Sequence, residues 1–206
     1  MADQTAHLWL IAGANGVGKT TFARARIREV TGSVRFVNLD EIARGLSPFD
    51  PMGEPIRAAR TASGMLRDFI EDRSRNGMPV LTTETTLSKR THLGLLAASR
   101  EAGIVTHLLY FAVTDPEVSI TRVAQRVREG GHDVPETDLR RRFGRSLANL
   151  PAYIDAVDEW TLFDANPRTP AEVARGRRGC AMARDLKGRD LPAPVHATLM
   201  ALPDCD

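Results

Sequence analysis

The sequence predicts an α/β fold, in which a parallel sheet of about five strands carries helices on both faces. Three observations lead to this prediction. Short apolar runs of the kind found in buried parallel strands occur along the chain. They alternate with longer stretches in which apolar residues recur at helical spacing. The composition, with 42% hydrophobic and 26% charged residues, is that of a globular protein.

The expected strands are five runs rich in apolar and β-branched residues, at positions 7–13, 34–39, 79–83, 104–113 and 160–164. The expected helices are at 19–30, 55–75, 89–102, 115–129 and, as one or two helices, 136–157. The fourth strand, for example, reads IVTHLLYFAV, and the helix before it stops at Gly103. Because a helix follows each of the first four strands, the chain can return and start the next strand in the same direction.

The 206 residues are enough for one domain of ordinary size, or one domain with a small appendage. We expect the domain to span 1–175, with a helical lid at about 115–150. From about Arg175 onward glycine, proline and charged residues mix without clear periodicity. Residues 176–206 are therefore expected to form a tail or a small helical appendage.

Composition narrows the choice of partners. The net charge of +2 is too small to demand a nucleic acid, and no apolar run approaches the ~18 residues of a membrane span. The two cysteines, Cys180 and Cys205, show no partner pattern and indicate neither a disulfide framework nor a metal site. Together with an N-terminus that lacks the basic region of a signal peptide, this predicts a cytoplasmic protein that binds neither nucleic acid nor membrane.

The clearest motif lies directly after the first expected strand. Residues 13–20 read GANGVGKT and match G-x-x-x-x-G-K-[ST], with a strand before the motif and a helix after it. Glycines let successive backbone N–H groups point at one phosphate, and the following helix adds its positive N-terminal end. Lys19 is expected to contact the β- and γ-phosphates, and the Thr20 hydroxyl to hold Mg²⁺. The predicted nucleotide-binding residues are Gly13, Ala14, Asn15, Gly16, Val17, Gly18, Lys19 and Thr20, with Thr21 as a second hydroxyl at the helix N-terminus.

Two acidic residues, Asp40 and Glu41, follow the second expected strand. One interpretation is a pair in which Asp40 holds Mg²⁺ and Glu41 activates water, as in an ATPase. Asp40 comes only 21 residues after Lys19, however, and such a pair usually lies further along the chain. The preferred interpretation is that Asp40 acts as the general base, or positions the hydroxyl that is attacked.

Glu84 ends the third expected strand, and Thr83, Thr85, Thr86 and Ser88 surround it. The carboxyl edge of a parallel sheet is where open α/β folds bind ligands. Glu84 is therefore expected to contact substrate hydroxyls or to hold Mg²⁺ through water, and Thr85 to contact substrate.

An arginine-rich segment follows the fourth strand. Seven arginines fall within 24 residues, on both sides of a Gly-Gly-His sequence: Arg122, Arg126, Arg128, Arg140, Arg141, Arg142 and Arg145. Two Arg-bearing helices around a flexible loop suggest a lid over phosphates, where guanidinium groups neutralise the transferring phosphoryl group. Arg126 and Arg142 are the predicted catalytic pair because both lie near the loop. His132 is expected to be structural or to touch substrate.

These segments together resemble the zeta toxin family of P-loop kinases, in its small stand-alone members. The similar stretches are GANGVGKTT at 13–21, VNLDEIARGLSP at 37–48, ETTLS at 84–88, the Arg-rich stretch at 122–150, and LFDANPRTPAEVA at 162–174. The resemblance implies a P-loop kinase-like fold that uses ATP and Mg²⁺ to phosphorylate a sugar hydroxyl of a UDP-amino sugar, chiefly UDP-N-acetylglucosamine. It also implies a cognate antitoxin that blocks the nucleotide site.

For the site, the resemblance implies that Lys19 and Thr20 bind ATP and Mg²⁺, that Asp40 is the base, and that Glu84 contacts substrate. Position 165 is alanine where the resemblance leads us to expect asparagine, which leaves Asn166 as the residue on the adenine side.

We therefore expect an ATP-dependent phosphotransferase that acts on a small-molecule hydroxyl. Two alternatives stay open. A P-loop ATPase or switch module is suggested by the Asp40–Glu41 pair, although the chain has neither an LSGGQ-like signature nor an NKxD motif. A module that binds nucleotide without turnover is disfavoured by the presence of Lys19, Thr20 and Asp40 together.

Overall fold

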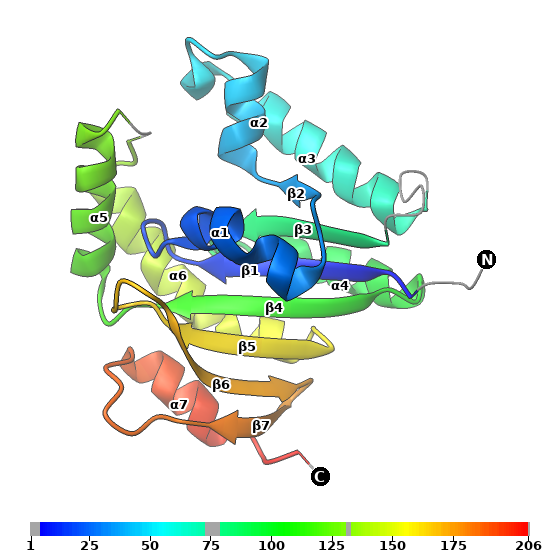
Figure 1. Ribbon diagram of the computed structural model, residues 1–206, viewed down its shortest axis with the longest axis vertical. Helices are drawn as coiled ribbons and strands as arrows, with labels where there is room; N and C mark the ends of the chain where they lie inside the picture. Colours follow the sequence, from blue (N-terminus) through cyan, green and yellow to red (C-terminus); the bar gives the residue numbers. More distant parts are fainter. Residues whose placement is uncertain (1–4, 73–78, 131–132, 206) are drawn as a thin grey trace.

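A seven-stranded mixed sheet forms the centre of the molecule (Figure 1). The computed structural model describes residues 5–72, 79–130 and 133–205. The strands follow the order β2-β3-β1-β4-β5-β6-β7 across the sheet. Their bounds are β1 His7–Gly13, β2 Phe36–Val37, β3 Val80–Thr85, β4 Val105–Ala112, β5 Glu159–Asp164, β6 Ala171–Arg177 and β7 Cys180–Arg184. The five predicted strands are present and parallel, and β6 and β7 add an antiparallel hairpin.

Helices cover both faces of the sheet, as predicted. In Figure 1, α1 lies in front of the sheet and α4 and α6 lie behind it, while α2 and α3 stand beyond the β2 edge. Their bounds are α1 Lys19–Thr31, α2 Leu39–Leu46, α3 Pro55–Ile70, α4 Thr91–Glu101, α5 Pro116–Arg128, α6 Glu136–Ile154 and α7 Ala193–Ala201, with a 3-10 turn, η1, at Pro51–Gly53. Helix α2 was not predicted, because the segment after the second strand was read only for its acidic residues.

Strand β1 lies in the interior of the sheet. It pairs with β3 on one side and β4 on the other, and its residues Leu8, Leu10 and Ile11 are completely buried. The loop that follows β1 is therefore anchored on a rigid strand whose carboxyl end points to the same edge as those of β3 and β4.

The C-terminal residues continue the sheet. Strand β6 runs across position 175, where the domain was expected to end, and β7 follows it. The hairpin escaped prediction because its strands, AEVARGR and CAMAR, mix charged residues with small ones. Helix α7 packs against α6. The chain then returns to β7, where the Ala181 N–H donates to the Pro203 carbonyl (2.9 Å) and the Cys205 N–H donates to the Ala181 carbonyl (2.9 Å).

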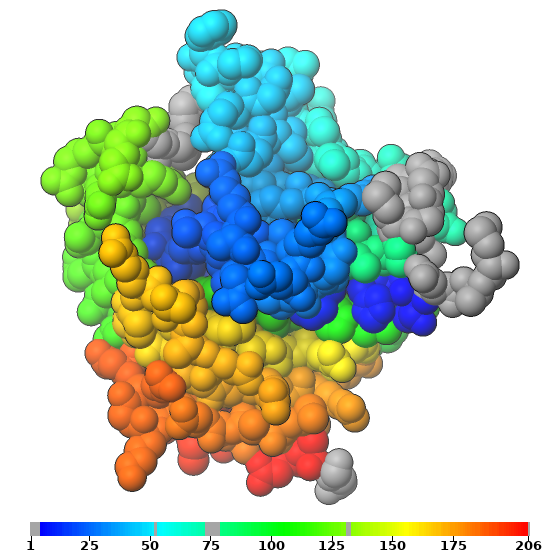
Figure 2. Space-filling model, in the orientation of Figure 1, coloured from blue at the N-terminus to red at the C-terminus, as the bar shows by residue number. Residues whose placement is uncertain are grey.

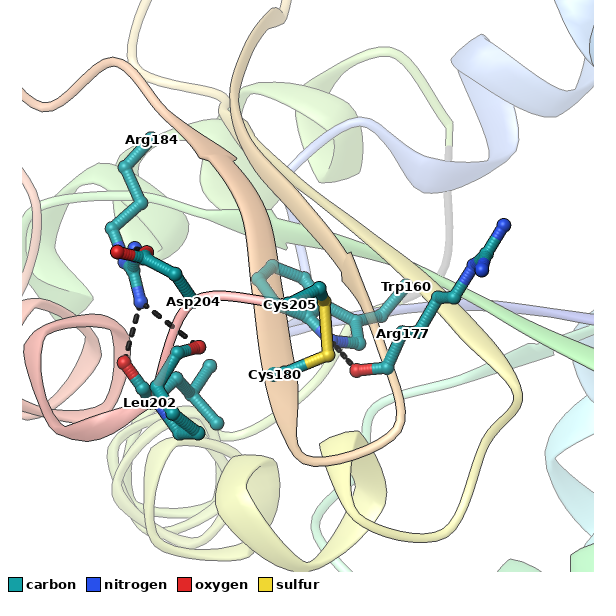
Figure 3. Close-up of a disulfide and its surroundings, with 8 residues drawn as sticks. Trp160, Arg177, Cys180, Arg184, Leu202, Asp204 and Cys205 are labelled. Carbon is teal, nitrogen blue, oxygen red and sulfur yellow. Dashed lines mark hydrogen bonds and ion pairs between the residues drawn. A yellow bond between two sulfur atoms is a disulfide. The ribbon is translucent and has the colours of Figure 1, made fainter.

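A disulfide joins Cys180 to Cys205 (Figure 3), so the interpretation of the cysteines as unpaired is wrong. The pairing depends on the fold, because β7 and the chain end are brought together by the hairpin and α7. Arg184 reinforces the same junction by donating to the Leu199 carbonyl (2.9 Å) and by pairing with Asp204. The free edge of β7 is thereby partly covered, which limits pairing with other chains.

Removing the disulfide is expected to destabilise the protein. The bond closes a loop with a sequence separation of 25, for which loss of chain entropy in the unfolded state predicts a contribution of about 3.5 kcal/mol. We expect Cys205→Ser to lower the free energy of unfolding in urea by that amount, and Cys180→Ser to match it. Reduction of the unmodified protein serves as the control. Equal unfolding midpoints for all forms would contradict the prediction.

A histidine pair lies near the amino ends of β1 and β4, at the opposite end of these strands from the phosphate loop. His107 is only 6% exposed, with its Nε2 2.9 Å from Nδ1 of His7 and its Nδ1 3.2 Å from Oε2 of Glu159. The indole of Trp9 stacks on its ring at 3.9 Å between centroids. Burial lowers the pKa of His107 to about 4; neighbouring His7 acts in the same direction, while Glu159 and Asp158 oppose the shift.

This pKa predicts that stability falls in mild acid. Between pH 6.5 and 4 the unfolded chain binds a proton that folded His107 does not, so the free energy of unfolding decreases as pH falls. Between pH 7 and pH 5 the loss is about 2 kcal/mol. We expect His107→Gln to reduce this dependence in urea unfolding measured at both pH values. His196→Gln, at an exposed histidine on α7, is the matched control and is expected to keep it.

Candidate active site

The phosphate loop has glycine where the structure leaves no room for a side chain. A Cβ on Gly13 would lie 2.4 Å from the Phe111 carbonyl oxygen, and one on Gly16 would lie 2.7 Å from that of Ser119. Both residues also have positive φ, of 136° and 75°. Gly13 thus permits close packing on β4, and Gly16 permits close packing on α5. The loop is therefore held between the sheet and helix α5.

A cleft of about 2040 Å³ opens beside this loop. Figure 2 shows the hollow between the surface of α5 (green) and that of α2 (light blue), next to the blue surface of the residues after β1. The cleft brings together most of the predicted site: the phosphate loop from residue 15 onward, Asp40, residues 83–86, several arginines of α5 and α6, and the loop after β5. A pocket for one small ligand usually measures about 300–1,000 Å³, so this cleft has room for two ligands side by side.

Lys19 lies at the floor of the cleft. Its side chain is 5% exposed, and its ammonium group donates to the Ala14 carbonyl (2.8 Å) and lies 3.7 Å from Oε1 of Glu84. Burial lowers the pKa of Lys19, while the carboxylates of Glu84 and Asp40 act to raise it. A buried cation that curls over the phosphate loop between two carboxylates is arranged to receive a further anion, such as a phosphate.

Glu84 connects the phosphate loop to the neighbouring strand. Because β3 pairs with β1 in a register that sets Glu84 opposite Ile11, its carboxylate reaches the start of α1. Oε2 of Glu84 accepts hydrogen bonds from the Thr20 hydroxyl (2.8 Å) and from Nδ2 of Asn38 (2.8 Å). Of the two predicted roles for Glu84, this geometry favours a role beside the metal rather than contact with substrate hydroxyls.

The donor set of Thr20 and Glu84 fits Mg²⁺. A hydroxyl and a carboxylate are hard oxygen ligands, and Mg²⁺ in nucleotide sites is usually held by one or two such groups and by the phosphates of the substrate. Among residues 5–72, 79–130 and 133–205 no cluster of three or more His, Cys, Asp or Glu side chains is suited to bind a metal without such help.

Asp40 and Glu41 have different surroundings, although they are adjacent in the first turn of α2. Asp40 is exposed and lines the cleft, close enough to Lys19 to raise its pKa. Glu41 accepts from Arg24 (2.7 Å) and from Arg44 (2.8 Å) and does not line the cleft. The structure therefore presents Asp40 to a ligand, and engages Glu41 in ion pairs on the outer side of the helix.

The segment after Glu84 is fixed by tertiary contacts. Leu87 is completely buried and has a positive φ of 57°, unusual for a leucine. Its carbonyl accepts from Nδ2 of Asn149 on α6 (2.9 Å), and its N–H donates to the Thr85 hydroxyl (3.2 Å). Thr85 lines the cleft, and its hydroxyl stabilises this turn; its contact with substrate stays a prediction.

The seven arginines divide into two groups. Arg128 and Arg140 do not line the cleft, and Arg140 pairs with Glu117 and Glu136 (2.5 and 2.7 Å). The five that line it are Arg122, Arg126, Arg141, Arg142 and Arg145. Arg126 acts to lower the pKa of Lys19, as a second cation lining the same cleft does. Arg142 lies 3.5 Å from Asp138, which also accepts from Arg141 (2.7 Å).

Arg122 has a structural task. Its two terminal nitrogens donate to the carbonyls of Ala165 and Asn166, both at 2.8 Å, and so hold the loop after β5 against α5. Helices α5 and α6 also share a small apolar cluster of their own, formed by Val123, Val134 and Leu139. The second half of α6, by contrast, belongs to the main core, so only the outer end of this pair resembles the predicted lid.

Asn166 uses its side chain to organise this loop. Its Oδ1 accepts from the backbone N–H of Thr114 (2.9 Å), and its Nδ2 donates to Oδ1 of Asp164 (2.8 Å) and to the Asp190 carbonyl (2.8 Å). The predicted contact of Asn166 with a nucleotide base stays a prediction, and the structure adds a role in fixing the loop. His132, the other predicted substrate residue in this region, lies outside the described residues.

Asn38 is a site residue that sequence reasoning missed. It is 5% exposed, caps α2 and contacts Glu84. A signal was present: Asn38 is followed three residues later by Glu41, the spacing of a capping box at a helix start. That pattern would have predicted both α2 and its cap.

Together, the strand–loop–helix at Gly13–Thr20 and the parallel sheet around it define a P-loop nucleotide-binding fold. Residues 8–145 match the AAA domain family, and the chain belongs to that family. An uncharacterized protein of Haemophilus influenzae is 30% identical over 131 residues, which cover 64% of this chain and 88% of that protein.

Solved structures agree on the fold. One comes from the PezAT chromosomal toxin–antitoxin system of Streptococcus pneumoniae: the TM-score is 0.64 and the identity 16%, over 99% of this chain and 79% of that one. Another is a chain of the AvrRxo1-ORF1:-ORF2 complex crystallised with ATP, with a TM-score of 0.65 and 18% identity, over 90% of this chain and 62% of that one. The chain thus shares its α/β P-loop fold with both structures, which agrees with the fold that the resemblance to the zeta toxin family predicted. Among the described residues, the helices are too short or too polar to cross a membrane.

Proposed function

We propose that this protein transfers the γ-phosphoryl group of ATP to a hydroxyl group of a small molecule. One observation carries the proposal: Asp40 lines the same cleft as Lys19, whereas Glu41 is occupied by Arg24 and Arg44. A carboxylate that faces the end of a phosphate loop, in a cleft with room for a second ligand, suits an acceptor hydroxyl better than hydrolysis by a water bound to Glu41.

In this reaction Asp40 accepts the proton of the acceptor hydroxyl as its oxygen bonds to the γ-phosphorus. The bond between that phosphorus and the β–γ bridging oxygen breaks, and ADP leaves with the electron pair. Lys19 stabilises charge on the β- and γ-phosphates, and the backbone of the phosphate loop orients them. Thr20 and Glu84 would hold Mg²⁺, which neutralises phosphate charge when bound.

Arg126 and Arg142 are the proposed catalytic arginines. Both line the cleft, and Arg126, on α5, acts to lower the pKa of Lys19. Guanidinium groups there would stabilise negative charge on the transferring phosphoryl group. The outer end of the α5–α6 pair, which has its own apolar cluster, is the part proposed to close over the substrates.

The proposed acceptor class is a UDP-amino sugar, with UDP-N-acetylglucosamine as the first candidate. Support comes from the sequence resemblance and from further cations that line the cleft, of which Lys89, Arg141 and Arg145 would suit a diphosphate. The hydroxyls of Thr85, Thr86 and Ser88 lie nearby and would suit a sugar.

Phosphoryl transfer from labelled ATP to UDP-sugars, nucleosides and simple sugars tests the proposal. We expect one acceptor class to be labelled, with Mg²⁺ required, and mass spectrometry to locate an added phosphate on that product. Hydrolysis of ATP without a labelled acceptor, in the panel or in cell extract, would favour the ATPase instead.

The proposal extends to partner and location. A cognate antitoxin that covers the nucleotide side of the cleft is the proposed protein partner, by analogy with the toxin–antitoxin origin of one structural relative. The proposed compartment is the cytoplasm, where ATP is available, although reducing compartments rarely retain a disulfide such as Cys180–Cys205. Alkylation of thiols at cell lysis, followed by mass measurement, tests this: a fully oxidised pair would contradict the cytoplasmic location.

A further inference from the structure

The side chain of Asn38 is hydrogen-bonded to two separate parts of the candidate active site. Its Nδ2 donates to Oε2 of Glu84 at the end of β3 (2.8 Å), and its Oδ1 accepts from the backbone N–H of Glu41 in the first turn of α2 (3.0 Å). The same helical turn carries Asp40. The residue is 5% exposed, so neither hydrogen bond competes freely with water.

We propose that Asn38 is a positioning residue that fixes the acceptor-side carboxylate, Asp40, relative to the metal-side carboxylate, Glu84. This inference rests on the proposed function. It assigns to Asn38 no contact with either substrate, only the task of holding the carboxylate beside the acceptor and the carboxylate beside the metal.

The chemistry of an amide explains why asparagine suits this position. The junction needs an acceptor for a helix N-terminal N–H and a donor for a carboxylate, on one short neutral side chain. Aspartate would keep the cap but place a second carboxylate against Glu84. Serine would keep the cap but is too short to reach Glu84, and alanine would lose both contacts.

The contact with Glu84 also determines how that carboxylate is oriented. Oε2 accepts from both Asn38 and Thr20, while Oε1 faces Lys19 at 3.7 Å. Without the Asn38 donor the carboxylate can turn away from Thr20. Partners of this kind behind a metal site typically change metal affinity or activity by about 10- to 100-fold when they are removed.

Asn38→Ser and Asn38→Asp test the inference. For both we expect kcat to fall roughly 10- to 100-fold. Because Asn38→Ser keeps the cap and adds no charge, its thermal midpoint should stay near that of the unmodified protein; Asn38→Asp should lower it, since a second carboxylate then lies against Glu84. As a readout independent of turnover, we measure ATP binding by calorimetry with and without Mg²⁺. The Mg²⁺-dependent gain in affinity should shrink, more for Asn38→Asp than for Asn38→Ser, while affinity without Mg²⁺ stays unchanged.

Two further variants separate positioning from folding. Asp50→Ser alters another cap in the segment between β2 and α3, at the start of η1, and Asp50 does not line the cleft. This variant should leave the Mg²⁺-dependent gain in ATP affinity intact. In a Glu84→Gln background, Asn38→Ser should have little further effect on the Mg²⁺ gain, because the two residues act through one contact.

The outcomes are distinct. If the unmodified protein phosphorylates its acceptor and Asn38→Ser matches it in kcat and Mg²⁺ gain, the positioning role is wrong and the proposed function stands. The positioning role is also wrong if Asn38→Ser reduces the Mg²⁺-dependent gain in ATP affinity as much in the Glu84→Gln background as it does alone. If the unmodified protein phosphorylates no acceptor, the proposed function fails, and the calorimetric arm still decides whether Asn38 orients Glu84.

Discussion

Lys19→Met is expected to reduce phosphoryl transfer by about 10³-fold. Methionine has nearly the length of lysine but no charge and no N–H donor. The variant therefore removes the cation expected at the β- and γ-phosphates while it leaves the shape of the phosphate loop unchanged.

The same substitution is expected to leave folding nearly intact. The Lys19 ammonium is buried, and its desolvation opposes the gain from Glu84 and Asp40. Its loss leaves the Ala14 carbonyl without its side-chain donor and Glu84 without its cation, but Glu84 keeps the hydrogen bonds from Thr20 and Asn38. The thermal midpoint should therefore change little while affinity for ATP falls, which separates loss of the site from loss of the fold.

Lys187→Met serves as the control for Lys19→Met, because Lys187 is an exposed lysine outside the lining of the cleft. Initial rates at saturating ATP and acceptor, with ATP affinity by calorimetry, give the comparison. Transfer by Lys19→Met within a few-fold of the control would show that the phosphate loop is not the site of chemistry.

The sequence was sufficient to predict those features that are determined by residues close together in the chain. The phosphate loop is one continuous segment, and its glycines, lysine and threonine predicted the turn, the helix start and the ligand together. The five parallel strands were found for a similar reason, since buried strands are apolar throughout and each is followed by a helical pattern. The structure confirms the turn, the helix start and the five parallel strands, and the ligand stays a prediction.

The features that could not be predicted from the sequence depend on contacts between residues that are far apart in the chain. Asn38 and Glu84 are 46 residues apart, and only the pairing of β2 with β3 brings them together. The cysteines meet because a hairpin of mixed composition extends the sheet. The lid arginines look alike in the sequence, yet Arg140 forms ion pairs on the surface and Arg122 holds a loop. A charge pattern specifies where cations occur but not which group each one meets.

Asp40→Asn is expected to lower transfer by roughly 10²- to 10⁴-fold, the usual contribution of a general base. The amide keeps the shape of the carboxylate but cannot accept the proton of the acceptor hydroxyl. Asp40 is exposed in the first turn of α2, where its loss costs the helix about 0.5 kcal/mol. ATP affinity should stay within about 3-fold, since the lost interaction belongs to the transition state.

Glu41→Gln is the matched control for Asp40→Asn, because it makes the same change of acid to amide at the next position of the same helix. It weakens exposed ion pairs with Arg24 and Arg44 that are worth at most about 1 kcal/mol. A kinase that uses Asp40 should therefore retain near-normal transfer in Glu41→Gln. An ATPase that uses Glu41 would show the reverse, with turnover lost and ATP trapped in Glu41→Gln while Asp40→Asn stays active. Because the two variants differ in one position and share their chemistry, the comparison assigns the reaction to one carboxylate or to the other.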